Sequence, residues 1–368
     1  MSAVIEIAPP SVRSEQAPIN GALESPVVVD PITHPNWDAI LADHADASFF
    51  HSSAWARVLI DTYGHTPNYF CRFAGGRLKQ LLAVMEVTSP LTGRRGVSLP
   101  FADFCSPLTS DGEDLHPLYE FAAQHGRERN WRYLECRGAG KQMCADAIPS
   151  LAFFGHIILL KDGEEWLFRR MDAGVRRAVR RAQQHGVTVE FCNSSDSIGI
   201  YYALHCQTRR RHGVPPQPFC FFENLQRHVI AAGKGVVVIA RAENRPIAAA
   251  VFLHEGRHAL YKFGASELEF QHLRPNNLLM WEAVKHYFHN GFTDLHMGRT
   301  SLHNEGLRRF KLGFGAEEER IEYTKHELHR GVFLKDVDRA SGPLNNVFRH
   351  LPPSLLCLAG RLLYRHLS

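Results

Sequence analysis

The chain has 368 residues and a formal net charge of +4 at pH 7, with 45% hydrophobic and 22% charged residues. This composition is ordinary for a soluble globular protein, and the length favours two domains. The charge is too small to indicate nucleic-acid binding, so a basic function would require local clustering of Arg and Lys. No apolar run reaches the length of a membrane span.

The eight cysteines are scattered, without a CxxC pair or the Cys/His spacing of a zinc site. We interpret them as buried free thiols of a reducing cytosol, and we expect no metal. The N-terminal stretch carries Glu6 and two prolines where a signal peptide would need an apolar core. A cytoplasmic protein is therefore expected.

In the N-terminal half, residues 1–30 are rich in Ser, Pro and Ala and predict a flexible leader. Ser52 is suited to cap a helix that ends near Gly64. Further on, a turn at Gly75 and Gly76 separates two β-suited runs, which predicts a hairpin over 68–87. We expect a helix over 115–129 and a strand over 133–136 to follow it.

Residues 169–182 form the most basic segment of the chain. Val175, Ala178, Val179 and Ala182 follow helical spacing, so Arg176 stacks with Arg180, and Arg177 with Arg181, on the outer face of the helix. This face is either simply solvated or a clamp for phosphate groups. Residues 209–211, three consecutive arginines, could belong to the same patch, but a loop cluster of this kind is usually only solvated.

The C-terminal half repeats the outline of the N-terminal half. Apolar runs over 235–240, 247–252 and 259–263 predict an antiparallel meander, and the period then changes to that of a helix capped by Asn and followed by Gly291. A strand over 293–297, a short helix over 307–311 and a charged strand over 320–323 complete it. We interpret the two halves as a diverged structural duplication.

Motifs in this half resemble those of FemAB-like proteins, including the BioF2-like acetyltransferases. They are the residues 275–282 (Pro-Asn-Asn-Leu-Leu-Met-Trp-Glu), Asp294 with Gly298 and Arg299, and the residues 307–316 around Phe310 and Lys311. The segments 50–55 and 98–103 resemble the N-terminal half of the same family. In detail the chain is most similar to members linked to exopolysaccharide and exosortase (PEP-CTERM) systems.

This resemblance implies an α/β fold with mixed sheets, arranged as two tandem GNAT-like domains at 31–165 and 166–328. Residues 329–368 would form a basic amphipathic tail. The implied activity is transfer of an acyl or aminoacyl group from acyl-CoA or aminoacyl-tRNA to an amine or hydroxyl, by direct attack and without a covalent enzyme intermediate. The acceptor would be a small molecule or a lipid-linked glycan of the cell envelope.

The resemblance also implies site residues. Donor phosphates would meet the helix N-terminus at Asn276 and Asn277, where backbone amides converge, with Arg299, Arg176 and Arg180 as further phosphate contacts. Lys311, Asp294 and Asp103 are the candidate catalytic side chains, and His296 and His303 are weaker candidates for a base. The chain has Gln271-His272-Leu273-Arg274 where acetyl-CoA enzymes carry a glycine-rich turn, so the donor stays open.

The sequence is compatible with three hypotheses of function. The first is the active transferase, with tRNA only as a co-substrate. The second is a catalytically inactive tandem-GNAT scaffold in an exopolysaccharide or envelope assembly system, and the third is an RNA-binding module, which would need more basic and aromatic surface residues. The tail could lie on the inner membrane face, giving a peripheral location, or pack against the body of the protein.

Overall fold

The computed structural model describes residues 23–367 except 111, 139 and 339–343, and these residues divide into two compact units. The N-terminal unit contains 23–153, 320–338 and 363–367, and the C-terminal unit contains 154–319 and 344–362. These bounds differ from those of the two predicted domains, 31–165 and 166–328, and of the predicted tail, 329–368. The predicted division of the chain therefore stays a prediction. The difference arises because the segment 320–338 pairs with strands of the N-terminal unit.

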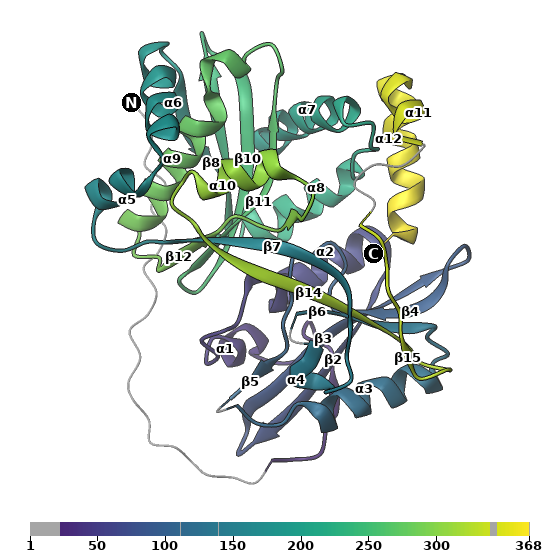
Figure 1. The fold of residues 1–368 in the computed structure, drawn as a ribbon. Coiled ribbons are helices and arrows are strands. Elements are labelled where there is room, and N and C mark those ends of the chain that lie inside the picture. The colour runs from purple at the N-terminus through teal and green to yellow at the C-terminus, as the bar shows by residue number, and fades with distance from the viewer. Residues whose placement is uncertain (1–22, 111, 139, 339–343, 368) are drawn as a thin grey trace. The chain divides into compact units, whose positions relative to one another are not determined.

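The N-terminal unit is built on a mixed sheet in the order β1-β2-β3-β4-β6-β14 (Figure 1). Its helices and strands are α1 (Trp37–Leu41), η1 (Phe49–His51), α2 (Ser53–Tyr63), α3 (His116–Glu128), α4 (Gly140–Met143), β1 (Val27–Val29), β2 (Thr66–Ala74), β3 (Arg77–Ser89), β4 (Gly93–Val97), β5 (Leu108–Thr109), β6 (Tyr133–Arg137), β14 (Glu317–Glu327), β15 (Val332–Phe333) and η4 (Tyr364–His366).

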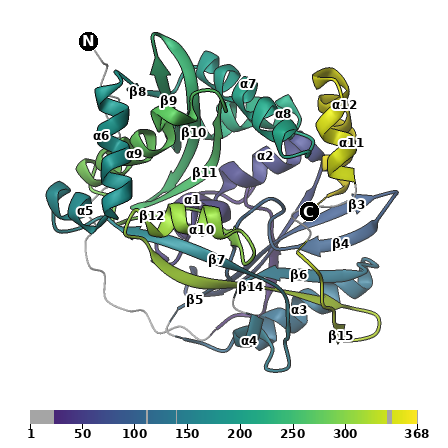
Figure 2. The ribbon, with the colours of Figure 1, turned by 45° about the horizontal axis from the view of Figure 1, so that its top comes forward.

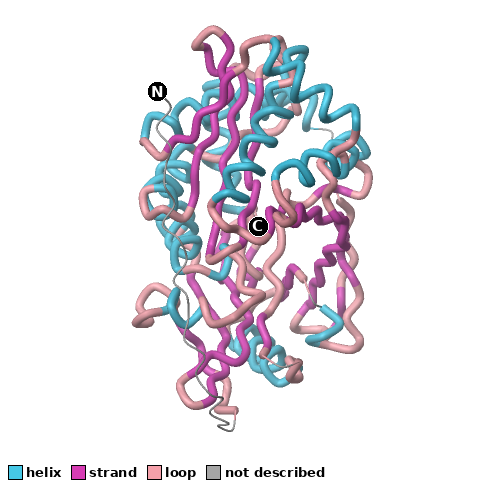
Figure 3. Tube along the Cα trace, turned by 90° about the vertical axis from the view of Figure 1, so that its left-hand side faces the viewer, coloured by secondary structure: helices cyan, strands magenta, loops and turns pink. Residues whose placement is uncertain are grey.

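The C-terminal unit has the strand order β7-β12-β11-β10-β9-β8, with helices on both sides of the strands (Figures 2 and 3). Its strands are β7 (Pro149–Leu159), β8 (Thr188–Cys192), β9 (Gly235–Ala242), β10 (Arg245–Glu255), β11 (His258–Ser266), β12 (Asp294–His296) and β13 (Thr300–Ser301). Its helices are α5 (Glu164–Arg170), α6 (Ala173–Gln184), α7 (Ser195–Arg211), α8 (Phe219–Leu225), η2 (Gln226–Ile230), η3 (Gln271–Leu273), α9 (Pro275–His289), α10 (Glu305–Leu312), α11 (Leu344–His350) and α12 (Pro353–Leu363).

The two units repeat one strand topology, which confirms the predicted duplication. In the N-terminal unit β2, β3 and β4 form an antiparallel meander, α3 follows, and β6 returns parallel to β4. In the C-terminal unit β9, β10 and β11 form the meander, α9 follows, and β12 returns parallel to β11. A helix crossover is needed in both cases because parallel neighbours cannot be joined by a tight turn.

The core of the C-terminal unit forms between the sheet and helices α6 and α9. Alternate side chains of β9 and β10, including Val238, Ala250 and Phe252, pack with Trp281 and Tyr287 of α9. The predicted basic helix is confirmed as α6, whose Val179 and Ala182 are buried in the same core. The period-two and period-3.6 apolar patterns therefore fix which faces meet.

Several predicted local features need correction. The leader prediction for 1–22 lies outside the described residues, but Val27–Val29 forms a strand that pairs with β2, so the flexible segment cannot extend to residue 30. Helix α9 is preceded by Arg274 rather than by an Asn cap. The three arginines 209–211 are the last turn of helix α7, not a loop.

The C-terminal helices pack partly against the body of their unit. Leu356 and Gly360 of α12 are buried, and α11 contacts α7. The opposite side of α12 is exposed and apolar, since Leu355, Leu358 and Leu362 lie one helical turn apart along it. The tail therefore packs on the protein through one face and leaves a leucine stripe uncovered.

Two glycines of helices in the C-terminal unit are expected to respond oppositely to alanine. A Cβ on Gly360 would lie 2.0 Å from the carbonyl oxygen of Pro216, whereas a Cβ on Gly199 of α7 would meet nothing within 4 Å. Gly360→Ala should lower the free energy of unfolding by about 1–3 kcal/mol because the clash is with backbone. Gly199→Ala should raise it by about 0.5–1 kcal/mol. Urea unfolding of both variants measures this, and equal shifts of the same sign would contradict the packing of α12.

Buried histidines predict acid sensitivity. Burial lowers the pKa of His205 from 6.5 to about 3. It lowers the pKa of five other histidines from 6.5 to about 4, namely His51, His65, His156, His254 and His286. Between pH 6.5 and 4 the unfolded chain binds protons that the folded chain does not, so stability should fall as the pH falls.

Replacing one of these histidines tests the assignment. His254 is placed by the carbonyl of Gly233 and the hydroxyl of Tyr287. His254→Gln should reduce the slope of unfolding free energy against pH by about 1.4 kcal/mol per pH unit, the value of one proton. The exposed His329→Gln serves as the control, and an unchanged slope in the His254 variant would refute the assignment.

Candidate functional site

The parallel pairing of β11 and β12 is short. It joins His258, Ala259 and Leu260 to Asp294, Leu295 and His296, whereas on its other edge β11 pairs with β10 as far as Ser266. The stretch from Tyr261 to Ala265 therefore runs past the end of β12. Because alternate residues of a strand bond to opposite neighbours, half of its backbone groups face this open edge.

Gly264 lies on this open edge and lets an aromatic side chain approach it closely. The backbone N–H of Ser266 donates to the hydroxyl of Thr208 in α7 rather than to β10, so Ser266, and Gly264 two residues before it, direct their amides to the open side. A Cβ on Gly264 would lie 1.8 Å from the hydroxyl of Tyr261. Burial raises the pKa of Tyr261 to about 12, so its hydroxyl stays protonated at neutral pH.

The strand leads to the N-terminus of α9. Asn276 in the first turn donates from Nδ2 to the Ser266 hydroxyl at 3.2 Å, which ties the helix start to the strand end. Pro275 occupies the first turn, where its missing N–H costs nothing. Asn276 and Asn277 are both half-buried there. The positive end of a 15-residue helix thus faces the end of the open edge.

Arg274 precedes this helix in a left-handed conformation, with φ of 60°. Glycine adopts this conformation without strain, whereas a side chain costs about 1 kcal/mol or more. The turn geometry associated with glycine is therefore kept here by an exposed arginine. Its place at the helix N-terminus adds an exposed cation next to the amide groups of α9.

Lys311 is buried, with 2% of its surface exposed, and is held inside the C-terminal unit. Its Nζ donates to the carbonyl oxygens of Gly298 at 2.7 Å and Arg299 at 3.1 Å. The lysine therefore ties helix α10 to the turn that follows β12. Gly298 adopts φ of 70° in this turn, a value that suits glycine.

Polar side chains from β7 and β14 surround this lysine. His156 is fully buried, its Nε2 lies 3.2 Å from Glu318, and its pKa is lowered to about 4 by burial and then by the charge of Lys311. Glu318 accepts two hydrogen bonds from Arg308, and these hold the pKa of its carboxyl below the usual value. His156 is therefore neutral at pH 7, and the negative charge of Glu318 is balanced by the positive charge of Arg308.

His296 belongs to the same cluster but has both ring nitrogens engaged. Its Nδ1 accepts from the backbone N–H of Gly298 at 2.9 Å, so in the neutral ring Nε2 carries the proton and donates to Glu319 at 3.2 Å. The ring is placed to shape the turn at Gly298 rather than to accept a proton. His303, the other predicted base, is exposed in the loop before α10.

The structure places Asp294 at the opposite end of β11 from the predicted phosphate-binding residues Asn276 and Asn277. Its carboxylate contacts Nδ1 of His258 at 2.6 Å and the hydroxyl of Thr293 at 2.9 Å, at the beginning of both parallel strands. Ser266 lies at the far end of β11, about 26 Å along an extended strand. The catalytic role of Asp294 stays a prediction, and the distance of Asp294 from Ser266 does not favour it.

The predicted phosphate-binding arginines lie on the surface of the C-terminal unit. Arg299 is exposed at the turn that Lys311 holds. Arg176 of α6 donates to the carbonyl of Arg169, and Arg180 stacks over the ring of Phe168, 5.5 Å from its centroid. Their roles toward phosphate stay predictions.

Asp103 lies in the N-terminal unit, in a strained loop. Leu99 and Phe101 have positive φ of 52° and 63°. The buried Arg137 donates to the carbonyls of Leu99 and Ala102, and the hydroxyl of Tyr323 donates to that of Asp103. Strain of this kind persists only where surrounding contacts enforce it. In this unit β4 ends at Val97, where its pairing with β6 also ends.

Sequence reasoning missed Arg274, Tyr261, Gly264, His156 and Glu318. Only Arg274 had a local signal, since it replaces a residue of the glycine-rich turn. The others depend on contacts between distant segments. Within the described residues no three His, Cys, Asp or Glu side chains gather as metal ligands, and none of the described helices is long and apolar enough to cross a membrane.

Comparison with known proteins agrees with this geometry. The family model for the acetyltransferase (GNAT) domain matches residues 169–320. No curated protein matches the sequence.

Solved structures share the fold of both halves. The crystal structure of FemX is 14% identical, with a TM-score of 0.64, over 81% of this chain and 97% of that one. A tandem GNAT protein from the clavulanic acid biosynthesis pathway is 12% identical, with a TM-score of 0.55, over 83% and 98% of the two chains. The L-PGS of Bacillus licheniformis is 12% identical, with a TM-score of 0.51, over 89% and 96%. The chain therefore has a tandem GNAT-like fold, similar to that of the clavulanic acid pathway protein and to the structure of FemX, and its residues 169–320 match the GNAT domain model.

Proposed function

We propose that the protein is an acyl or aminoacyl transferase whose donor binds in the C-terminal unit. The open edge of β11, which leads directly to the N-terminus of α9, is the observation that carries this proposal. Backbone amides along the edge suit the arm of a carrier such as CoA, and the helix terminus suits its phosphates. The N-terminal unit offers no equivalent edge in its described residues, because β4 ends at Val97, where its pairing with β6 ends.

Transfer requires little covalent chemistry from the protein. The nitrogen or oxygen of the acceptor attacks the donor carbonyl, and the carbonyl oxygen gains negative charge. The bond to the carrier then breaks, and overall the proton that the acceptor loses ends on the carrier. A backbone amide at the open edge, such as that of Gly264, can stabilise the developing oxyanion. The neutral hydroxyl of Tyr261 can donate to the leaving carrier, since its pKa is raised to about 12.

The predicted side chains take different roles in this proposal. Lys311 acts as a positioning residue that fixes the turn at Gly298 and Arg299, because its ammonium group donates hydrogen bonds to the carbonyl oxygens of both residues. Arg299 is exposed on that turn and is placed to meet the donor or acceptor. Arg274 adds a cation at the start of α9 and replaces the glycine of acetyl-CoA enzymes.

The donor class is acyl-CoA or aminoacyl-tRNA, and the acceptor is an amine or hydroxyl of a cell-envelope, polysaccharide or lipid-linked molecule. FemX and L-PGS, which share the fold, support an envelope or lipid acceptor. The exposed leucines of α12 with Arg361 support a peripheral contact with the inner membrane face. The inactive scaffold remains the alternative that the following experiments separate.

Substitutions at Arg274 test the donor site. Arg274→Gly and Arg274→Ala both remove the cation, and each should weaken donor binding about tenfold if one charge-assisted hydrogen bond is lost. Without ligand, Arg274→Gly should melt at or above the wild-type midpoint because glycine relieves the left-handed strain. A thermal-shift titration with acetyl-CoA, longer acyl-CoAs and aminoacyl-tRNA gives both quantities.

The control for this titration is Arg227→Ala, an exposed arginine outside the site. It should leave the donor-induced shift intact. If none of the donors raises the wild-type midpoint, the transferase proposal fails and the scaffold alternative takes its place.

Lys311 and Arg299 should affect different kinetic constants once the donor is known. Lys311→Met keeps the apolar volume but frees the turn, so kcat should fall by about tenfold to a hundredfold while the donor KM changes little. Arg299→Ala should mainly raise a KM. Release of the carrier thiol or of deacylated tRNA follows turnover. Unchanged kcat in a folded Lys311→Met protein would remove this residue from the mechanism.

A further inference from the structure

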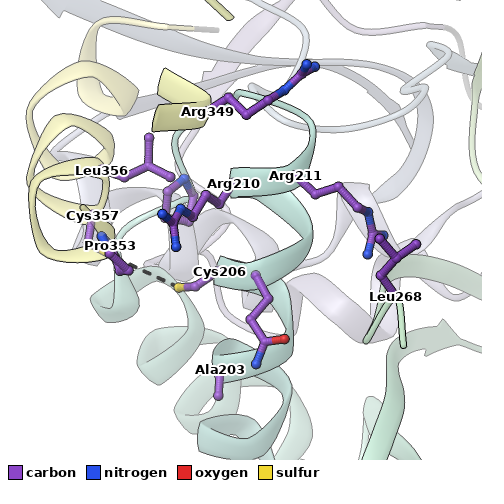
Figure 4. A pocket seen from close by; sticks show the side chains of 11 residues that line it. Ala203, Cys206, Arg210, Arg211, Leu268, Arg349, Pro353, Leu356 and Cys357 are labelled. Carbon is purple, nitrogen blue, oxygen red and sulfur yellow. Dashed lines mark hydrogen bonds between the residues drawn. The ribbon is translucent and has the colours of Figure 1, made fainter. Parts of the chain in front are cut away.

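A pocket of about 530 Å³ opens in the C-terminal unit beside the last turns of α7. Its walls come from α7, the segment at Pro216, the loop at Leu268 and the two C-terminal helices α11 and α12 (Figure 4). It is lined by residues that play no part in the proposed transfer chemistry. Its volume is in the range of sites that hold small organic molecules.

The polar lining is strongly basic. Arg210 and Arg211 of α7 and Arg349 of α11 line the pocket, and none of the described acidic side chains does. Figure 4 shows Arg210 between α7 and α12, Arg211 directed toward Leu268, and Arg349 on α11 with its guanidinium directed away from Arg210. Glu267, next to Leu268 in the chain, is paired with Arg245 at 2.7 Å. Guanidinium groups in such a set favour an anion with several oxygens, above all phosphate.

The remaining lining is apolar and partly open to solvent. Leu268 is 63% exposed although it forms a wall, and Pro216 and Leu356 line the same pocket from other segments. An apolar wall next to guanidinium groups suits a ligand in which a phosphate is attached to an alkyl chain. A small hydrophilic anion would leave this wall in contact with water.

Close backbone contacts build the pocket. Gly360 of α12 packs against the carbonyl of Pro216, and Gly213 packs beneath the carbonyl of Asn345, where a Cβ would lie 2.1 Å away. The side chain of Asn345 also donates to the carbonyl of His212 at 3.4 Å. The C-terminal helices are thus held on α7 at two points, one on each side of the pocket.

We propose that this pocket binds the phosphate head group of an amphiphile, with its alkyl chain on the wall of Leu268, Pro216 and Leu356. Arg211 also donates to the carbonyl of Ser266, the residue whose hydroxyl holds Asn276 at the start of α9. The occupant therefore lies next to the proposed donor site. Binding itself does not depend on the proposed transfer reaction and is measured without turnover.

Calorimetric titration of the full chain with octyl phosphate, below its aggregation threshold, tests the site. Binding of octyl phosphate should be at least tenfold tighter than that of inorganic phosphate and of octyl glucoside. Arg210→Ala with Arg349→Ala should weaken it about tenfold or more. The matched control, Arg227→Ala with Arg330→Ala, removes the same charge from exposed positions outside the pocket and should bind as the wild type does.

Thiol labelling supplies a second readout that needs no variant. Cys206 and Cys357 line the pocket with their sulfur atoms 3.9 Å apart, whereas Cys220 is exposed outside it. Octyl phosphate should slow alkylation of Cys206 and Cys357 by a maleimide severalfold and leave Cys220 unchanged.

The outcomes separate the two proposals. Equal affinity for inorganic phosphate would show a free-anion site, equal affinity for octyl glucoside would show an apolar groove, and either result overturns the amphiphile site. Absence of both binding and thiol protection overturns it as well. Amphiphile binding without any donor-induced thermal shift would support this site while the transferase proposal fails.

Discussion

The three-residue parallel contact between β11 and β12 constrains the rest of the C-terminal unit. Because the strands are parallel, the chain must return from Ser266 to Asp294 by a crossover, and α9 supplies it. A helix that runs back along the sheet necessarily begins at the end where β11 finishes. The unpaired edge of β11 and the N-terminus of α9 therefore meet at Ser266, and the hydrogen bond from Asn276 fixes them there. The candidate donor site follows from topology before any particular side chain is considered.

The N-terminal unit shows what happens when the same topology lacks this extension. The third strand of its meander, β4, ends together with its parallel pairing to β6, so the described residues of this unit contain no overhanging edge. The residues that follow fold into the strained loop at Leu99 and Phe101. Arg137 and Tyr323 donate hydrogen bonds to backbone carbonyls of this loop. Two copies of one topology have thus been put to different uses. One extends a strand past its partner, and the other replaces the extension with a rigid loop.

Sequence reasoning recovered what is encoded locally. The meander from Gly235 to Ser266, the helix α9 and the basic helix α6 each carry a periodic apolar pattern, and Ser52 and Gly64 bracket α2 with ordinary capping chemistry. The site was less predictable because its partners are distant in the chain. The sequence around Lys311 does not show that its ammonium group donates to the carbonyls of Gly298 and Arg299. The sequence around Asp294 does not show that its carboxylate contacts His258, at the end of β11 opposite to Ser266. The pocket beneath α12 was equally invisible, since it exists only once two helices from the end of the chain are placed on α7.

The burial of Lys311 explains how a cation can shape the site without touching substrate. An ammonium group removed from water is tolerated only where its protons are accepted, and here two carbonyl oxygens accept them. His156 stays neutral beside it, so no second positive charge opposes the lysine, and Glu318 is neutralised by Arg308. Those two carbonyl groups point inward to the lysine, and the turn that carries Arg299 is consequently held in a single orientation. The electrostatic cluster thus acts on the proposed reaction through backbone geometry rather than through a side chain that touches the substrate.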